Sequence, residues 1–100
     1  MESELLMPVS VDSLTFANAR QTLQTGLDAI RAGQHTFDLA NVAHADSSSI
    51  AVMLAWQRAA KTAFREIRFL NTPENILSLA ALYGVTDLLE LEPRANTPTE

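Results

Sequence analysis

The stretch FDLANVAHADSSSI, residues 37–50, joins the two most informative segments of the chain. It begins inside residues 36–40, a short apolar segment between polar residues, which predicts a buried strand. It ends inside residues 48–63, which contain no glycine or proline and are rich in Ala, Leu and Met. That composition over that length predicts a helix. A buried strand followed by a long helix indicates an α/β unit.

Helix and strand patterns also alternate on the N-terminal side of this stretch. Apolar residues recur every three or four positions from Phe16 to Ile30, with Thr15 as a candidate N-cap and Gly33 just past the end. Glycine costs a helix about 1 kcal/mol relative to alanine, so at Gly26 we expect the helix to be thin or closely approached. Residues 5–11 contain a proline and predict an edge strand at best.

On the C-terminal side, residues 67–70 predict another short strand. Thr72 and Pro73 predict the cap and first residue of a helix that ends at Gly84. Residues 88–91 predict a last strand, and the polar, proline-containing end of the chain is typical of disorder. We therefore expect one α/β domain over residues 1–92, a small mixed sheet with helices packed against it, and a flexible tail over residues 93–100.

The composition of the 100 residues disfavours several classes of function. Twelve acidic and seven basic residues give a formal charge of −5, which repels a phosphate backbone, so we expect no nucleic-acid partner. Cysteine is absent, which excludes disulfides and thiolate metal sites. The sequence starts with acidic residues where a signal peptide is basic, and no apolar run reaches the ~18–20 residues of a membrane span. We expect a cytoplasmic protein without direct membrane insertion.

The residue types that perform catalysis in enzymes do not form a recognisable catalytic motif in this sequence. The three glycines are too far apart for a phosphate-binding loop. His35 and His44 flank the predicted strand at opposite ends and have no carboxylate at metal-ligand spacing. His44 precedes Ser47 by three residues, but no glycine-flanked nucleophile turn is present. We therefore expect a protein that is not an enzyme and that uses no metal or cofactor.

Asp46, Ser47, Ser48 and Ser49 form the strongest candidate site. They lie at the predicted start of the longest helix, where free backbone N–H groups and the helix dipole favour oxygen acceptors and anions. One interpretation is capping alone, and the other is a hydroxyl displayed for a partner or a phosphate. Trp56 belongs to an apolar surface wider than one sheet contact needs, so it is either a core residue or a partner-facing one.

Residues 37–50 resemble the signature of STAS domains, the sulfate-transporter and anti-sigma-factor-antagonist family, in which a buried strand is followed by Asp-Ser-Ser-Gly-Leu at a helix start. Residues 69–71, 81–85 and 88–91 look like the second half of that family, so the resemblance covers about residues 14–91. It implies a STAS-like α/β fold. Family members usually have glycine in place of Ser49 and two strands before the first helix. The shorter N-terminal part predicts a sheet edge open to another chain, including a second copy.

Within the family, residues 14–19, LTFANA, are most similar to the small cytoplasmic subunit of Mla-type phospholipid ABC transporters. This resemblance implies a bacterial accessory subunit that binds and supports the transporter's ATPase subunit at the inner membrane, in the maintenance of outer-membrane lipid asymmetry. The alternative is an anti-sigma factor antagonist, which binds an anti-sigma factor and is switched by a serine kinase. Carried over to this sequence, the phosphorylated position is Ser47.

Overall fold

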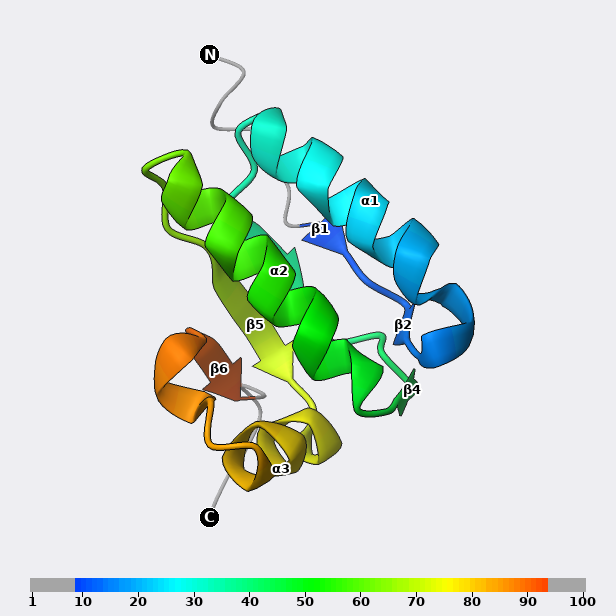
Figure 1. The fold of residues 1–100 in the computed structure, drawn as a ribbon. Coiled ribbons are helices and arrows are strands. Elements are labelled where there is room, and N and C mark those ends of the chain that lie inside the picture. Colours follow the sequence, from blue (N-terminus) through cyan, green and yellow to red (C-terminus); the bar gives the residue numbers. More distant parts are fainter. Residues whose placement is uncertain (1–8, 94–100) are drawn as a thin grey trace.

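The computed structural model describes residues 9–93, which form a sheet and a layer of helices (Figure 1). The four strands of the sheet are, in spatial order, β1 (Val9–Ser10), β3 (Thr36–Asp38), β5 (Arg68–Thr72) and β6 (Leu91–Pro93). Two further short strands, β2 (Ser13–Leu14) and β4 (His44–Ala45), pair with each other. The predicted α/β fold is confirmed. All strand pairs within residues 9–93 are parallel, whereas the sequence predicted a mixed sheet.

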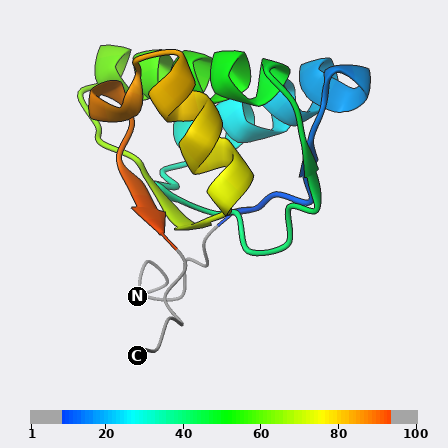
Figure 2. The ribbon, with the colours of Figure 1, turned by 90° about the horizontal axis from the view of Figure 1, so that it is seen from below.

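The three α-helices found among residues 9–93 cover one face of the sheet (Figure 2). They are α1 (Ala19–Arg31), α2 (Ser48–Thr62) and α3 (Glu74–Leu82), and two 3₁₀ turns, η2 (Phe16–Asn18) and η3 (Thr86–Leu88), precede α1 and follow α3. The strand order follows the chain order, so successive right-handed crossovers place their helices on the same side. No helix described between residues 9 and 93 is long and apolar enough to cross a membrane.

Trp56 lies at the centre of the core between α2 and the sheet. Its ring stacks on Phe37 of β3 at a centroid distance of 4.5 Å, and the ring of Phe69 of β5 lies 6.3 Å away. The indole N–H donates to the carbonyl of Leu23 in α1 at 3.0 Å. Trp56 is 0% exposed, so the core interpretation is confirmed and the partner-facing one is wrong.

Gly26 explains how α1 approaches the core so closely. A Cβ atom added at this position would lie 2.2 Å from the Trp56 ring, which is far inside van der Waals contact. The close approach predicted at this glycine is therefore confirmed, and its cause is the edge of the indole ring.

Some predicted boundaries differ from the structure. The described part of the predicted edge strand is β1, while residues 5–8 lie outside the described residues. Thr72 is not a cap, because it ends β5 and its hydroxyl donates to the Phe69 carbonyl at 3.4 Å. Helical hydrogen bonding starts at the carbonyl of Pro73, whose backbone is extended.

The last predicted strand begins later than expected. Leu88 ends η3 and is exposed, and β6 starts at Leu91. A short leucine-rich run has no periodicity that distinguishes a strand from a turn. Pro93 ends β6, and the rest of the predicted tail lies outside the described residues.

Candidate functional site

Asp46 joins the starts of two helical segments. One carboxylate oxygen accepts hydrogen bonds from the backbone N–H of Ser48, at 2.9 Å, and from the Ser48 hydroxyl. The other accepts from the backbone N–H of Phe16, at 2.9 Å. The Asp46 backbone continues this junction, since its N–H donates to the Leu14 carbonyl and its carbonyl accepts from Ser49. Asp46 thus satisfies free N–H groups at the starts of both α2 and η2.

These hydrogen bonds also set the ionisation of Asp46. The Ser48 hydroxyl and then the Phe16 N–H hold the pKa of the Asp46 carboxyl below its ordinary value, because both donate to the charged form. Asp46 therefore places a fixed negative charge at the start of α2 near neutral pH. The capping interpretation is correct for Asp46, and the Ser48 hydroxyl supports this cap by donating to the Asp46 carboxylate.

The three serines that follow Asp46 differ in what they contact. Ser48 is half-buried and bonded to Asp46. Ser49 is 0% exposed, and its hydroxyl has no hydrogen-bond partner among residues 9–93. Ser47 is exposed, and among the described residues its hydroxyl makes no hydrogen bond, because Asp46 already supplies the cap. Ser47 is therefore the hydroxyl that this helix start leaves free.

Ser47 lies at a shallow apolar groove between α2 and the end of α3. The groove is lined by Ser47, Ile50, Ala51, Leu54, Tyr83 and Val85. Tyr83 remains 52% exposed. On the other side of the helix start, the backbone of Phe16 is bonded to Asp46 and its side chain is 81% exposed. Apolar side chains thus surround an unpaired hydroxyl at the start of α2, and we call this set the Ser47 surface.

Sequence reasoning missed part of this surface. Phe16 belongs to the apolar pattern of the first helix, and the pattern predicts that it faces the core. It is exposed because it lies in η2, where the 3₁₀ turn departs from the α-helical period. Tyr83 and Val85 come from a segment far along the chain, so no local pattern could have placed them beside Ser47.

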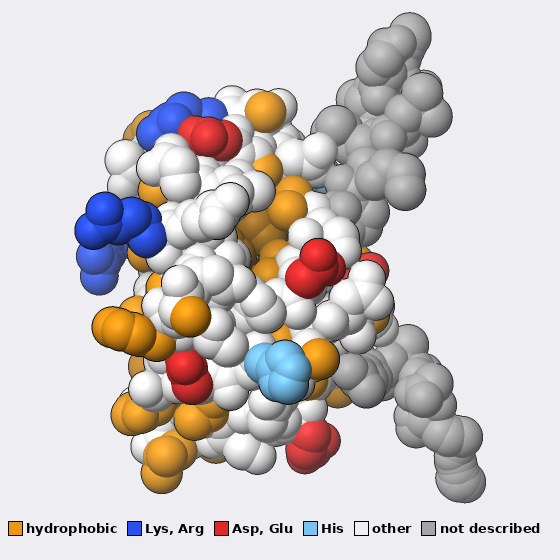
Figure 3. Space-filling view, turned by 90° about the vertical axis from the view of Figure 1, so that its right-hand side faces the viewer, with side chains coloured by type: hydrophobic (Ala, Val, Ile, Leu, Met, Phe, Trp, Pro, Cys, Tyr) orange, Lys and Arg blue, Asp and Glu red, His pale blue; other side chains and the backbone are white. Residues whose placement is uncertain are grey.

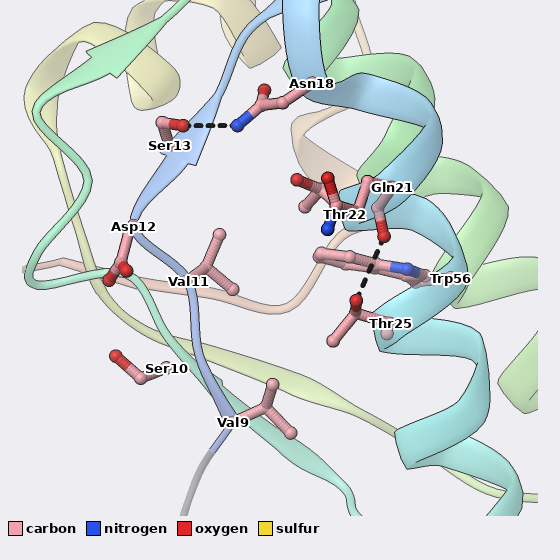
Figure 4. Close-up of a pocket in the computed structure, with 11 residues that line it drawn as sticks. Val9, Ser10, Val11, Asp12, Ser13, Asn18, Gln21, Thr22, Thr25 and Trp56 are labelled. Carbon is pink, nitrogen blue, oxygen red and sulfur yellow. Dashed lines mark hydrogen bonds between the residues drawn. The ribbon is translucent and has the colours of Figure 1, made fainter.

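A hollow lies on the side of the molecule viewed in Figure 3, between β1 and α1, with hydrophobic side chains at its floor. Figure 4 shows Val9 and Val11 pointing towards Trp56, which lines the opposite side of the hollow. Three of its polar side chains bond within the chain: Asn18 donates to the Ser13 hydroxyl, and Thr25 donates to a backbone carbonyl of its own helix. Other polar side chains of the lining, among them Asp12 and Gln21, make no hydrogen bond with residues 9–93.

The described residues offer little to a metal or to hydrolytic chemistry. Between residues 9 and 93 no group of three or more His, Cys, Asp or Glu is placed to hold a metal ion. His44 is exposed in β4, and no hydrogen bond joins it to Ser47 in this part of the chain. The arrangement around Ser47 is suited to contact with another molecule.

Comparison with known proteins agrees with this fold. Residues 10–90 match the family model described as "Mlab, STAS domain". The match spans more than half of the chain, so this protein belongs to the STAS domain family. No curated protein matches the chain.

Proposed function

We propose that this STAS domain is a cytoplasmic, non-enzymatic accessory subunit that binds and supports the ATPase subunit of a phospholipid ABC transporter. The matching family model carries the Mlab description, and residues 14–19 resemble the small subunit of such transporters. The observation that carries the proposal is the Ser47 surface. A hydroxyl without an intramolecular partner among residues 9–93 lies at an apolar groove, where it can donate to a docked protein.

The chemistry of the Ser47 surface favours a protein as the partner. Its groove is lined by aliphatic side chains, the ring of Tyr83 and two hydroxyl groups, those of Ser47 and Tyr83, and protein interfaces commonly combine an apolar centre with a few hydrogen bonds. The charge nearest to Ser47 is the Asp46 carboxylate, which belongs to the cap. A phosphate or another anion would meet that negative charge.

The alternative function is an anti-sigma factor antagonist whose partner exchange is controlled by phosphorylation of Ser47. The exposure of Ser47 favours it, because a kinase needs an accessible hydroxyl. The start of α2 also offers a dipole that stabilises a phosphate, although Asp46 opposes it. In this alternative the partners are an anti-sigma factor and a serine kinase.

A titration tests the proposal directly. The purified ATPase subunit of a phospholipid transporter from the same organism is titrated with the wild-type chain, with Ser47→Glu and with Ser47→Thr. A carboxylate at the docking surface should weaken binding at least tenfold, about 1.4 kcal/mol, whereas threonine keeps the hydroxyl and should be nearly neutral. Circular dichroism melts of all proteins run in parallel, and we expect Ser47→Glu to keep a native-like melting temperature.

Thr62→Glu is the matched control, since it places the same carboxylate on an exposed residue at the other end of α2. It should bind like the wild type. Equal affinities for the wild type and Ser47→Glu would contradict the role of this surface. Failure of the wild type to bind the ATPase, together with phosphorylated Ser47 in mass spectra of the native protein, would favour the anti-sigma factor antagonist.

A further inference from the structure

The backbone turns left-handed after each of the three α-helices, but only one of these turns uses a bulky residue. Gly33 follows α1 with a φ of 103°, and Gly84 follows α3 with a φ of 71°. Phe64 follows α2 with a φ of 59°. Glycine is the usual residue at this position because it has no Cβ to clash, and an L-residue costs roughly 1–2 kcal/mol more there.

The side chain of Phe64 does not compensate this cost within the chain. The ring is 97% exposed, so it gains almost nothing from burial. The turn itself is well formed, since the N–H of Arg65 donates to the Ala60 carbonyl at 2.8 Å. Phe64 is unfavourable in two respects, because a bulky residue adopts a left-handed backbone and an apolar ring is exposed to water. Such a residue indicates an interaction outside the monomer.

Phe64 lies at a groove with one basic and one acidic wall. Lys61 and Arg65 line it from α2 and the turn that follows, and Asp87 of η3 and Glu90 line it from the other side. Glu66, next to Arg65, adds one acidic side chain to the wall that carries the two basic residues, and Gln57 and Leu88 complete the lining. Among residues 9–93 no ion pair within 4.0 Å joins the two walls. We call this set the Phe64 surface.

Two further details make this surface suitable for contact. The guanidinium of Arg65 donates to the Ile30 carbonyl at 2.6 Å, which holds this side chain in place at the end of α1. Leu88 is 59% exposed, so it adds a second apolar side chain to the exposed ring. The surface therefore has an apolar centre between side chains of opposite charge.

We propose that the Phe64 surface is the interface between two copies of this chain, related by a two-fold axis. A two-fold contact must be complementary to itself. In the proposed dimer, the apolar centres of the two copies face each other. The basic wall of each copy faces the acidic wall of the other, so the same charge pairing occurs twice. A partner with charge of a single sign, such as an anionic lipid surface, would be repelled by one of the walls.

This interface shares no residue with the Ser47 surface, although Val85 of that surface accepts a hydrogen bond from the backbone of Leu88. The two lie at opposite ends of α2, whose 15 residues span roughly 22 Å at ~1.5 Å per residue. A dimer formed through Phe64 therefore leaves Ser47 accessible, and the proposal does not rest on the ATPase-binding function. Variants at Ser47 should not change self-association, so the two proposals can fail independently.

Sedimentation velocity of the full chain tests the dimer. We expect the sedimentation coefficient to rise from that of a monomer to that of a dimer between about 10 µM and about 1 mM, the range for a small interface. Phe64→Gly should weaken association at least tenfold and at the same time raise the melting temperature, because glycine suits the left-handed turn. Phe16→Ala removes another largely exposed aromatic ring, at the other end of α2, and should leave association unchanged.

Charge reversal tests the two-fold symmetry. Lys61→Glu and Asp87→Lys should each weaken association, because each places like charges opposite one another twice. An equimolar mixture of the two variants should form a heterodimer as stable as the wild-type dimer, since every reversed charge then meets a reversed partner. A wild-type chain that stays monomeric over the whole range, an unchanged association in Phe64→Gly, or a mixture no better than its components would overturn the proposal.

Discussion

At its N-terminal end α2 is held by Asp46, whose carboxylate takes up the free N–H groups of the first turn and of η2. At its C-terminal end the helix closes with a left-handed turn at Phe64, where the other two helices use glycine. The first end is thus stabilised by its cap, and the second carries a residue that lowers stability. The comparison separates residues that the fold needs from residues that it does not.

Ser47 and Phe64 are residues that the fold does not need. The cap works through Asp46 and Ser48, so the Ser47 hydroxyl adds no hydrogen bond to the described part of the fold. The turn after α2 would be more stable with glycine in place of Phe64. Each end therefore displays one residue that the monomer does not explain, and these two residues carry our functional proposals.

The largest effect that we predict comes from the middle of α2, between these two ends. Trp56→Ala should lower the free energy of unfolding by about 3–5 kcal/mol, because it removes a fully buried ring from the aromatic stack. Denaturant unfolding measures this loss. Under conditions where the variant is folded, affinity for the ATPase and self-association should both match the wild type. A folded variant that loses either one would show that the ends of α2 do not act independently.

Much of the fold follows from local patterns in the sequence. The composition of residues 48–63 predicts a helix, and α2 spans Ser48–Thr62. A glycine inside the first helix predicts a close approach, and the Trp56 ring provides it. The aspartate and serines before α2 predict a cap, and Asp46 forms it. In each case the structural feature is determined by the residue types and backbone hydrogen bonds of one short segment.

Other features depend on contacts that no local pattern contains. The apolar residues of α2 occupy two neighbouring stripes, and only the sheet and α1 decide that Trp56 points inwards. Phe64 fits the apolar spacing of α2, but the helix ends before it, so its ring points into solvent. The groove at Ser47 needs Tyr83 and Val85 from the segment that follows α3, whose position relative to α2 is set by packing.

The next effect concerns the cap at the N-terminal end of α2. The pKa of Asp46 is lowered in the folded state, so its ionised form stabilises the fold above the ordinary aspartate pKa of about 3.9. This contribution is lost as the pH falls through the folded-state value. Asp46→Asn cannot titrate, so it should be less stable than the wild type at pH 7, and the difference should shrink in acid.

Thermal melts between neutral and acid pH measure this difference in stability. Asp12→Asn is the matched control, because Asp12 is exposed and its carboxylate accepts no hydrogen bond from residues 9–93. Its effect on the melting temperature should be small at every pH. An Asp46→Asn variant whose deficit is the same at neutral and acid pH would show that the charge of Asp46 does not matter, and that hydrogen bonding alone caps α2.

The smallest effect comes from two neighbouring serines of the same turn, and its sign should differ between them. Ser49→Ala removes a buried hydroxyl that has no partner among the described residues and improves helix propensity, so it should raise the free energy of unfolding by about 0.5–1 kcal/mol. Ser48→Ala removes the hydroxyl that donates to Asp46, so it should lower stability despite the same gain in propensity. Denaturant melts of both variants under one set of conditions give the comparison. Stabilisation by both substitutions would show that the hydroxyl of Ser48 does not support the cap. Destabilisation by both would show that the buried hydroxyl of Ser49 makes a stabilising interaction.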